Sequence, residues 1–263
     1  MSGGINVRRL LQLGAIGLAA SSENVSTATV PRSPSAFFED FKRLDERRWY
    51  VSDGWANGDW QNCSWSRRNL KLRDGILQLS LTRSPNPVRQ YRCAEIRTHA
   101  VLGYGTFEAR VRLARGSGLN TAMFTYSGRP LTGIHDEIDF EGLGRNPASV
   151  QINHWRAGKP ASVVNAAVGA DGSATFHDYA FEWSPNRIRW FIDGRLVHQA
   201  TRDIPRTPGQ LIFSLWSSGK SKQDWLGAFT APLPATAEID WVGWTPNGQR
   251  CRFPQSVTCR FPQ

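Results

Sequence analysis

Hydrophobic and polar residues alternate along several short segments of the chain, with the period of two that is typical of a half-buried β-strand. In residues 106–113, TFEARVRL, the apolar side chains of Phe107, Ala109, Val111 and Leu113 fall on one face and charged side chains on the other. A strand with one face on a hydrophobic core and one face in water has this pattern.

Turn signals separate these segments. Two Asp-Gly pairs, the strongest short-range sign of a β-hairpin, stand between alternating segments. They are Asp74-Gly75, between residues 70–72 and 77–81, and Asp193-Gly194, between residues 188–192 and 196–197. Further short apolar segments occupy residues 150–155, 179–183, 211–216 and 238–244. Since no heptad repeat or long amphipathic helix is visible, we predict an all-β fold, a sandwich of two antiparallel sheets.

Composition agrees with a single β-domain. The chain has 263 residues, of which 40% are hydrophobic and 21% charged, so intrinsic disorder is excluded. Its 24 Gly and 15 Pro argue against a coiled coil or a helical bundle. Lys and Arg number 32 against 22 Asp and Glu, a net charge of +10. Nucleic acid, an anionic surface and an acidic polymer are therefore all candidate partners.

The N-terminal segment has the layout of a secretory signal peptide, with two arginines before an apolar run at residues 10–20. This run is too short to span a membrane as a helix. We predict a signal peptide at residues 1–22, a flexible segment at 23–35 and one domain at 36–263. A twin-arginine signal is a minor alternative, because the residues around Arg8 and Arg9 match it poorly. A buried N-terminal helix is the alternative. The protein is expected to be secreted, extracellular or periplasmic, and a monomer without membrane contact.

Four cysteines fit an exported protein, because an even number permits full pairing in an oxidising compartment. They are Cys63, Cys93, Cys251 and Cys259, and they allow three connectivities. We favour Cys63–Cys93 and Cys251–Cys259, since each bond closes a local loop, the second in a short C-terminal tail. A zinc site is the competing interpretation, but the C-x2-C spacing is absent and no His lies at a suitable offset.

The segment HDEIDFEGLG carries the candidate chemistry. On a strand, Glu137, Asp139 and Glu141 point to one face while Ile138 and Phe140 point to the other. Like charges about 7 Å apart repel, so a purely structural strand would rarely carry them in a row. The buried opposite face keeps the acidic row aligned. A solvated acidic surface and a calcium-binding ladder are the alternatives.

Hydrolysis of a glycosidic bond would use such a row. It needs one ionised carboxylate to attack or stabilise the sugar cation and one protonated carboxyl to donate to the leaving oxygen. A central Asp139 raises the pKa of its neighbours by repulsion and shares a proton, which separates the two roles. On a straight strand, however, Glu137 and Glu141 lie about 13 Å apart at Cα, whereas retaining enzymes hold their carboxyl groups about 5 to 5.5 Å apart. A concave, curved sheet is therefore expected.

The same segment resembles the catalytic strand of glycoside hydrolase family 16, the laminarinases, lichenases and xyloglucan transferases, whose members typically read (H/W)DEIDxEFLG. The resemblance runs through most of the chain, in FFEDF, SDGWANG, QNCSW, YRCAEIRT, GYGTFEARV, SGLNTAMFTYSG, VQINHW, DYAFEWSPNRIRWFIDG, IPRTPGQLIFSLW and DWLG. It is close to bacterial lichenases, and closer to rhizobial endo-β-1,3-1,4-glycanases that depolymerise succinoglycan and have a similar CRFPQSVTC tail. The resemblance implies a β-jelly roll with a concave cleft and a retaining double displacement. Glu137 would be the nucleophile, Glu141 the general acid/base and Asp139 the residue that tunes them.

The resemblance also implies a sugar-binding cleft. Aromatic rings stack on the apolar faces of pyranose rings, while polar side chains hydrogen-bond to the hydroxyl groups. The positions that match are Trp55, Asn57, Glu95, Arg97, Phe124, Tyr126, His135, Asn153, Trp155, Trp216 and Trp225. Core packing is the alternative for any one tryptophan, above all for Trp183 and Trp190 in alternating segments.

No cofactor is expected for catalysis. Family 16 lichenases carry a structural calcium away from the cleft, and the matching positions here are Asp40, Gly75 and Asp240, of which Asp240 alone offers a clearly matching side chain.

Two positions depart from the family pattern. Gly142 replaces a bulkier residue, which predicts a looser strand or a wider cleft. His135 replaces the Trp of bacterial lichenases, which counts against strict lichenase specificity and predicts a polar neighbour of the carboxylates.

We therefore predict a secreted endo-β-1,3-1,4-glycanase acting on a polysaccharide, and an acidic exopolysaccharide such as succinoglycan is the favoured substrate. A lichenase on neutral glucan, a transglycosylase and a non-catalytic lectin-like module are the alternatives, and the intact carboxylate row weighs against the last. Nucleic acid is not an expected partner, because no binding motif is present. Without the signal peptide, 30 basic and 22 acidic residues remain, a net +8 that favours an acidic polymer.

Overall fold

The structure is a computed structural model that describes residues 35–85, 89–161, 163–249 and 253–257. The predicted signal peptide, nearly all of the predicted flexible segment and the predicted Cys251–Cys259 bond lie outside these residues. Among the described residues, no helix is long and apolar enough to cross a membrane.

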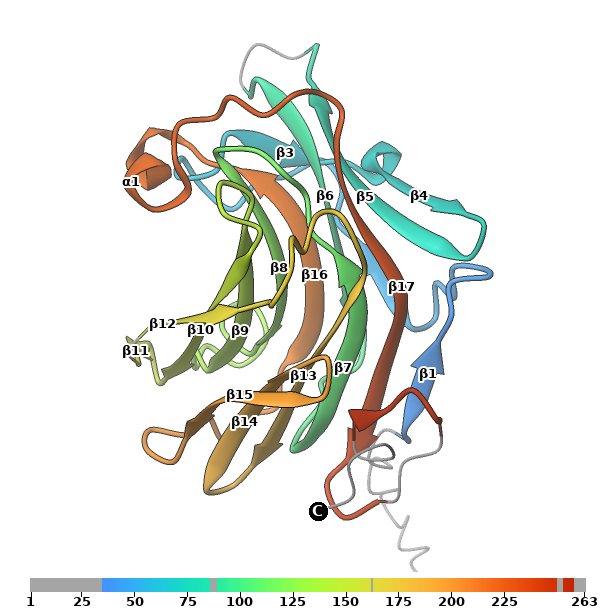
Figure 1. Ribbon diagram of the computed structural model, residues 1–263, viewed down its shortest axis with the longest axis vertical. Coiled ribbons are helices and arrows are strands. Elements are labelled where there is room, and N and C mark those ends of the chain that lie inside the picture. Colours follow the sequence, from blue (N-terminus) through green and yellow to red (C-terminus); the bar gives the residue numbers. More distant parts are fainter. Residues whose placement is uncertain (1–34, 86–88, 162, 250–252, 258–263) are drawn as a thin grey trace, which may run out of the picture. The chain divides into compact units, whose positions relative to one another are not determined.

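Two antiparallel sheets are packed face to face, as the alternating segments predict (Figure 1). The outer sheet contains, in spatial order, β4 (Leu70–Arg73), β5 (Ile76–Arg83), β17 (Ala235–Pro246), β7 (Gly105–Arg112), β13 (His177–Ser184), β14 (Arg187–Ile192) and β15 (Arg195–Ala200), and β1 (Phe37–Glu39) pairs with the end of β17. The concave sheet contains β2 (Trp49–Val51), β6 (Tyr91–Thr98), β16 (Gln210–Ser217), β8 (Leu119–Tyr126), β9 (Glu137–Leu143) and β10 (Ser149–Arg156), and β10 also pairs with β11 (Lys159–Pro160) and β12 (Val164–Ala167).

Short elements complete the described chain. The strand β3 (Cys63–Trp65) runs parallel to β6, and the end of β5 pairs with the start of β6, which joins the sheets. The helices are η1 (Arg67–Asn69), η2 (Lys220–Lys222) and α1 (Gln223–Leu226). The long strands β8 and β16 bend along their length in Figure 1, so the second sheet has the expected concave face. This is the predicted all-β jelly-roll sandwich.

Both predicted hairpins are confirmed. The Asp-Gly pairs connect β4 to β5 and β14 to β15. Asp74 and Gly75 have φ angles of 51° and 76°, and Asp193 and Gly194 have 50° and 76°. Positive φ at both central residues matches the right-handed twist of the strands, and Asp and Gly are the residues that tolerate it.

The core lies between the two sheets. Phe107 and Phe181 of the outer sheet stack at 4.8 Å, and Phe140 on the back of the concave sheet lies 6.4 Å from Phe181 between ring centroids. Trp183 and Trp190 are also buried, with exposed fractions of 2% and 0%. For these two tryptophans, core packing is therefore the correct interpretation.

The predicted Cys63–Cys93 bond is confirmed, with a Cα–Cα distance of 5.7 Å. It excludes these two thiols from a zinc site. The bond fastens β3 to β6, and both sulfur atoms are fully buried beside Gln61, whose Nε2 lies 3.2 Å from the Cys93 sulfur. The loop that immediately precedes Cys63 is thus tied to the concave sheet.

Replacing both Cys63 and Cys93 by Ser is expected to destabilise the domain. The bond closes a loop over a sequence separation of 30, so its loss should lower the free energy of unfolding by about 3 kcal/mol. Thermal unfolding should show a Tm lowered by about 6 to 12 °C. An unchanged Tm under non-reducing conditions would contradict a stabilising role.

Candidate active site

The three carboxyl groups of the row lie on β9, in the middle of the concave sheet. Their neighbours across β8 are Tyr126 for Glu137, Phe124 for Asp139 and Ala122 for Glu141, and across β10 they are Trp155, Asn153 and Gln151 in the same order. Ile138 and Phe140, which alternate with the acids, are 0% and 3% exposed in the core. The buried alternate positions thus hold the acidic row toward the concave face.

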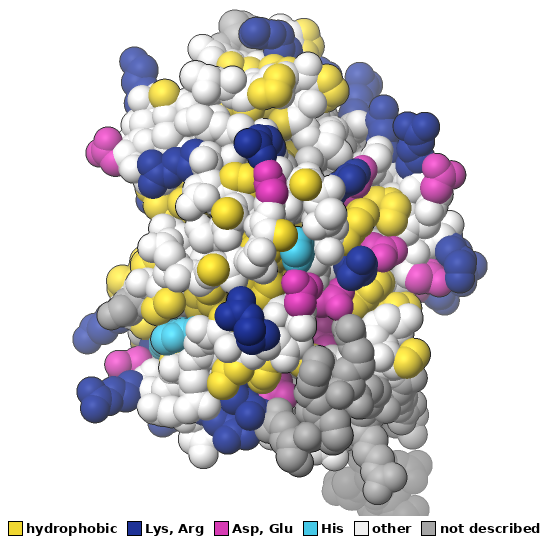
Figure 2. All heavy atoms as spheres, in the orientation of Figure 1, with side chains coloured by type: hydrophobic (Ala, Val, Ile, Leu, Met, Phe, Trp, Pro, Cys, Tyr) yellow, Lys and Arg dark blue, Asp and Glu magenta, His cyan; other side chains and the backbone are white. Residues whose placement is uncertain are grey.

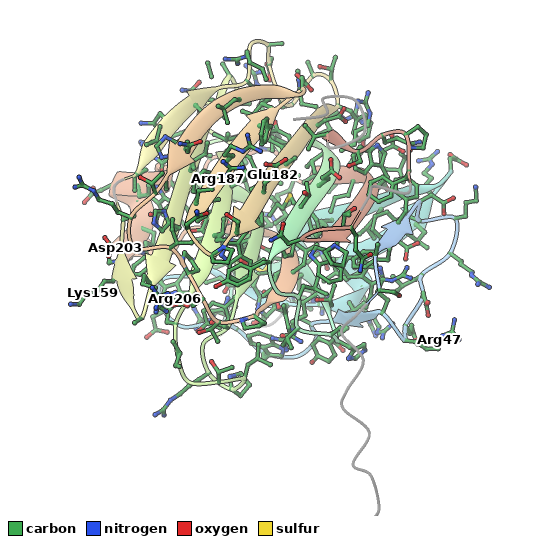
Figure 3. All side chains as sticks on the ribbon, turned by 90° about the horizontal axis from the view of Figure 1, so that it is seen from below. Arg47, Lys159, Glu182, Arg187, Asp203 and Arg206 are labelled. Atoms are coloured by element: carbon green, nitrogen blue, oxygen red, sulfur yellow. A yellow bond between two sulfur atoms is a disulfide. The ribbon has the colours of Figure 1, made fainter. Side chains whose placement is uncertain are left out.

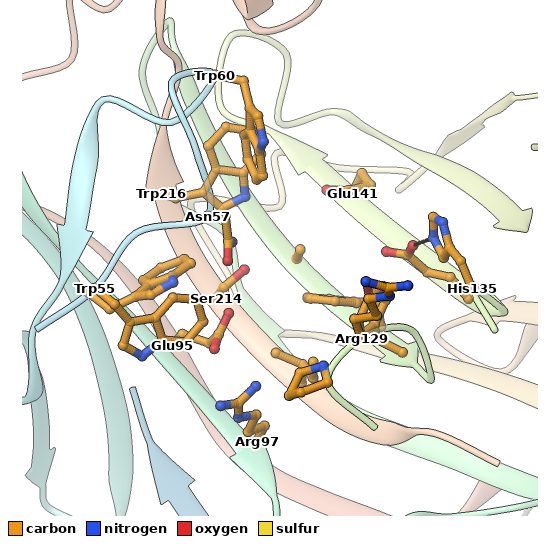
Figure 4. A pocket seen from close by; sticks show the side chains of 17 residues that line it. Trp55, Asn57, Trp60, Glu95, Arg97, Arg129, His135, Glu141, Ser214 and Trp216 are labelled. Carbon is orange, nitrogen blue, oxygen red and sulfur yellow. Dashed lines mark hydrogen bonds and ion pairs between the residues drawn. The ribbon is translucent and has the colours of Figure 1, made fainter. Parts of the chain in front are cut away.

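Two adjoining hollows open on this face. The first, about 660 Å³, lies over β8, β16 and β6, and the second, about 390 Å³, lies over β10 and the segment around α1. Trp60, Glu137, Glu141 and Trp216 line both. The hollows therefore form one cleft that crosses the strands and passes over the carboxylate row. In Figure 4 the tryptophans stand across the first hollow from Glu141 and His135.

The structure brings all eleven residues of the predicted sugar-binding set to this cleft. The first hollow is lined by Trp55, Asn57, Glu95, Arg97, Phe124, Tyr126, His135 and Trp216, and the second by Asn153, Trp155, Trp216 and Trp225. These residues come from four strands, two loops and the helix α1. Strand register explains four of these positions, because residues directly opposite each other on neighbouring strands share a face of the sheet. The four are Phe124 and Tyr126 on β8 and Asn153 and Trp155 on β10.

Several residues that line the cleft were not predicted, among them Trp60, Arg129, Gln151 and Lys222, and neither was Asn120, which donates to Glu141. Gln151 could have been found, since it alternates with Asn153 and Trp155 in β10. Trp60 lies in a loop with no periodic signal. Its ring centroid is 4.9 Å from that of Trp216, and its carbonyl oxygen accepts a 2.7 Å hydrogen bond from the Gly219 amide.

Glu137 is held by a hydrogen bond from the imidazole of His135, whose Nε2 lies 2.5 Å from Glu137 Oε2. The His135 ring stacks on Trp155, with centroids 4.8 Å apart and planes 18° apart. The stacked ring and the hydrogen bond fix the orientation of the carboxylate. The prediction that His135 is a polar neighbour of the carboxylates is confirmed.

Asp139 and Glu141 are the two carboxyl groups of the row whose pKa values are raised. Burial, with the charges of Glu137 and Glu141, raises the pKa of Asp139 well above its ordinary value, and Asp139 shares a hydrogen bond with Glu137. Burial also raises the pKa of Glu141 to about 8, with a further rise from the Glu137 charge. Asn120 donates its side-chain amide to Glu141 and lowers this pKa in part, as does the Lys222 charge. Glu141 is therefore mostly protonated at neutral pH, the state that a general acid requires.

The first hollow holds another buried acid. Glu95 is 4% exposed and accepts a 2.5 Å hydrogen bond from the Ser52 hydroxyl. Burial raises the pKa of Glu95, although Ser52 and the Arg97 charge oppose the shift. A carboxyl group placed this way can accept or donate hydrogen bonds to a ligand hydroxyl.

A fourth acid, Asp136, anchors the start of β9 and has no part in the cleft lining. Its carboxylate is 2% exposed and accepts hydrogen bonds from the Arg156 guanidinium at 3.0 Å and from the amides of Ala157, Arg206 and Thr207 at 2.7, 2.8 and 3.0 Å. Burial raises its pKa, but these amides outweigh burial and hold the pKa of Asp136 below its ordinary value. Asp136 thus joins β9 to the end of β10 and to the connection that carries Arg206, the residue labelled in Figure 3.

The expectation that Gly142 widens the cleft is wrong. Gly142 follows Glu141 on the strand, so it points away from the cleft and toward the core. A Cβ at this position would lie 2.7 Å from Leu113 Cδ2 and 3.1 Å from the Thr121 carbonyl oxygen. Leu113 therefore fills the space that a side chain at position 142 would need.

The predicted calcium positions lie away from the cleft. Asp40 and Asp240 line a separate hollow, and a Cβ on Gly75 would lie 3.7 Å from the Asp40 carbonyl oxygen. Each carboxylate has a cationic partner, with Lys42 Nζ 2.7 Å from Asp40 and Arg110 Nε 3.4 Å from Asp240. Calcium takes six to eight oxygen ligands, and no cluster of three His, Cys, Asp or Glu suited to a metal occurs within the described ranges. As arranged, these residues do not fit calcium, and the ion stays an untested prediction.

A curved β-sandwich whose cleft combines tryptophans with a row of perturbed carboxyl groups defines a class, the polysaccharide-cleaving enzymes. Comparison with known proteins identifies the family within this class. Residues 57–243 match the profile of the glycosyl hydrolases family 16. The chain belongs to this family and is a glycoside hydrolase.

Similar proteins and similar solved structures are consistent with this family assignment. An endo-1,3-1,4-beta-glycanase, ExoK, of Rhizobium meliloti (strain 1021) is 44% identical over 228 residues, which cover 86% of this chain and 84% of that protein. A beta-glucanase of Bacillus amyloliquefaciens is 35% identical, with 90% of this chain and 98% of that protein covered. The solved beta-glucanase of Bacillus licheniformis aligns with a TM-score of 0.78 at 34% identity, covering 82% of this chain and 100% of that one.

Replacing Glu141 by Gln is expected to stabilise the protein at alkaline pH. Between the ordinary pKa of 4.5 and about 8, the unfolded chain releases the Glu141 proton while the folded chain keeps it, so wild-type stability falls as the pH rises. The amide removes this loss. Relative to wild type, the Tm of Glu141→Gln should rise by about 5 °C more at pH 9 than at pH 4.5. A pH-independent difference in Tm would contradict the raised pKa.

Replacing Asp136 by Asn should weaken the anchor of β9. In either orientation the amide places its NH2 group against a donor, which is the Ala157 amide at Oδ1 or the three donors at Oδ2, and it leaves Arg156 without its counter-charge. We expect a loss of about 3 kcal/mol in the free energy of unfolding, measured by urea titration. Asp224→Asn, at an exposed position of α1, is the matched control and should change it by less than about 0.5 kcal/mol. Equal stability of the two variants would refute the anchor.

Proposed function

We propose that this glycoside hydrolase is a secreted, endo-acting β-1,3-1,4-glycanase. The observation that most directly supports this proposal is the position of the carboxylate row between two hollows of one cleft. Sugars can bind on both sides of the scissile bond, as cleavage inside a chain requires. The name of one relative, an endo-1,3-1,4-beta-glycanase, supports this linkage class, and the beta-glucanase name of another supports a β-glucan substrate.

The proposed mechanism is a retaining double displacement. Glu137, oriented by His135, attacks the anomeric carbon while Glu141 gives its proton to the leaving glycosidic oxygen, and a covalent glycosyl-enzyme forms. Glu141, now ionised, takes a proton from a water molecule, which attacks the anomeric carbon and releases Glu137. Asp139 assists by sharing its proton with Glu137, so that the row never holds three negative charges.

An acidic exopolysaccharide such as succinoglycan is the substrate we favour over neutral mixed-linkage glucan. Arg97 and Arg129 line the first hollow, and neither forms an ion pair with another described residue. Arg97 lies instead over the rings of Tyr50 and Trp55, at 4.6 and 5.5 Å. Unpaired cations in a cleft suit an anionic ligand.

The distribution of charge over the face seen in Figure 2 supports a polysaccharide rather than a nucleic acid. Figure 2 shows Lys and Arg side chains scattered over the visible face, with acidic side chains between them. A nucleic-acid interface would gather basic side chains in a stripe or patch. Secretion remains part of the proposal, and it is supported by the predicted signal peptide.

The proposal is tested by reducing-sugar assays of wild type and Glu137→Gln on succinoglycan, lichenan and laminarin. We expect wild type to release sugars from at least one of the first two, and Glu137→Gln to be slower by about a thousandfold or more, because the amide is no nucleophile. No wild-type activity on any of the three, or equal activity of the two proteins, would refute the proposed function.

The same digest should show which anomer forms. Proton NMR of the first products should detect the β-anomer before mutarotation, as a double displacement requires. The viscosity of the polymer should fall faster than reducing ends appear, as internal cleavage requires. A first-formed α-anomer would refute the retaining mechanism while leaving the endo-glycanase intact.

A further inference from the structure

The second hollow contains a lysine whose charge acts on Glu141 but which forms no ion pair with the carboxylate row. Lys222 ends η2 and is half-buried in the hollow, with its Nζ 5.6 Å from the centroid of the Trp225 ring. It forms no ion pair within the described part of the chain. The Trp225 ring does not neutralise the ammonium charge, so this charge and its three N–H donors remain available to a ligand.

The neighbouring amides present donors to the same space. Trp225 Nε1 can only donate, and it lies 2.6 Å from Gln151 Oε1, so the amide oxygen of Gln151 is occupied and its NH2 group remains. Asn153 Oδ1 accepts the His154 backbone amide at 2.8 Å, which leaves the NH2 group of Asn153. An ammonium and two amide NH2 groups line the hollow, together with the rings of Trp155 and Trp225.

The acids of β9 on the floor of this hollow do not exclude an anion. Burial raises the pKa of Asp139 well above its ordinary value and that of Glu141 to about 8, which disfavours a negative charge on either group. One carboxylate oxygen of Glu137, Oε2, accepts the hydrogen bond from His135. The row therefore presents less negative charge to Lys222 than three exposed carboxylates would.

We propose that the second hollow is a subsite for a sugar that bears a carboxylate, either on its own ring or on an attached acid group. Lys222 pairs with the carboxylate, Gln151 and Asn153 donate to its oxygens or to neighbouring hydroxyls, and a tryptophan ring supports the pyranose. The inference rests on the proposed function and adds a position to it. The charged sugar binds on the side of the carboxylate row away from Glu95 and Arg97.

Lys220 provides a matched control for Lys222. It lies at the other end of the same short helix, is exposed, and lines neither hollow. Lys220→Gln and Lys222→Gln therefore remove the same charge from the same element, but from different surroundings. A general effect of net charge on an anionic polymer would be equal in the two variants.

The test compares two derivatives of lichenan with the same low degree of substitution, carboxymethyl and hydroxyethyl, which differ in charge and little in bulk. Lys222→Gln should lower kcat/KM on the carboxymethyl derivative at least about fivefold more than on the hydroxyethyl one, as loss of one ion pair predicts. Lys222→Arg should restore most of the difference, and Lys220→Gln should leave both values unchanged. The difference should shrink in 0.5 M salt, where charges are screened.

Equal losses on both derivatives would overturn the subsite and assign Lys222 to the support of Glu141 or of the local fold. Equal effects of the Lys220 and Lys222 substitutions would also overturn it. If wild type cleaves neither derivative nor lichenan, the proposed function fails instead. Affinity electrophoresis of Glu137→Gln then tests the subsite by itself. The carboxymethyl derivative should retard this variant more than the hydroxyethyl derivative does. The double variant Glu137→Gln, Lys222→Gln should lose this difference, and its persistence would overturn the subsite.

Discussion

Three carboxyl groups on one face of one strand, withdrawn from bulk water, cannot all be ionised, and the rest of the site depends on this constraint. A proton must stay in the row, and burial keeps it on Asp139 and Glu141, whose pKa values are raised. Asn120 donates to Glu141 and His135 to Glu137, so the ends of the row differ in their surroundings. The difference between the two ends supplies the separate roles of a nucleophile and an acid.

The scaffold keeps this crowded row in place from three directions. Ile138 and Phe140 bury the back of β9 in the core. Asp136 fastens its beginning through four hydrogen bonds, and the Cys63–Cys93 bond ties the loop of Trp55 and Trp60 to β6. None of these groups belongs to the chemistry, yet each limits how far the carboxyl groups or the walls of the cleft can move apart.

Strand periodicity and turn residues predicted most of the fold, because both act locally. The Asp-Gly hairpins, the strands and the direction of the acidic row follow from alternation within a few residues. The same rule, applied with care, corrects the error at Gly142, which must face Leu113 since its neighbour Glu141 faces the cleft. Trp60 and Lys222 escaped prediction because each lies outside the strands, where no period shows which way a side chain points.

By itself the sequence determined the β-sandwich, the acidic row of β9 and, through its motifs, the family 16 resemblance and the candidate cleft residues. Only the tertiary structure decided which hollow each residue lines, which carboxyl groups have a raised pKa and that Lys222 lies beside Trp225 with no ion pair among the described residues. The physical reason is that alternation and turn preference are set by neighbours along the chain. Burial and charge interaction depend instead on strands and loops that are distant in sequence and meet only when the concave sheet forms.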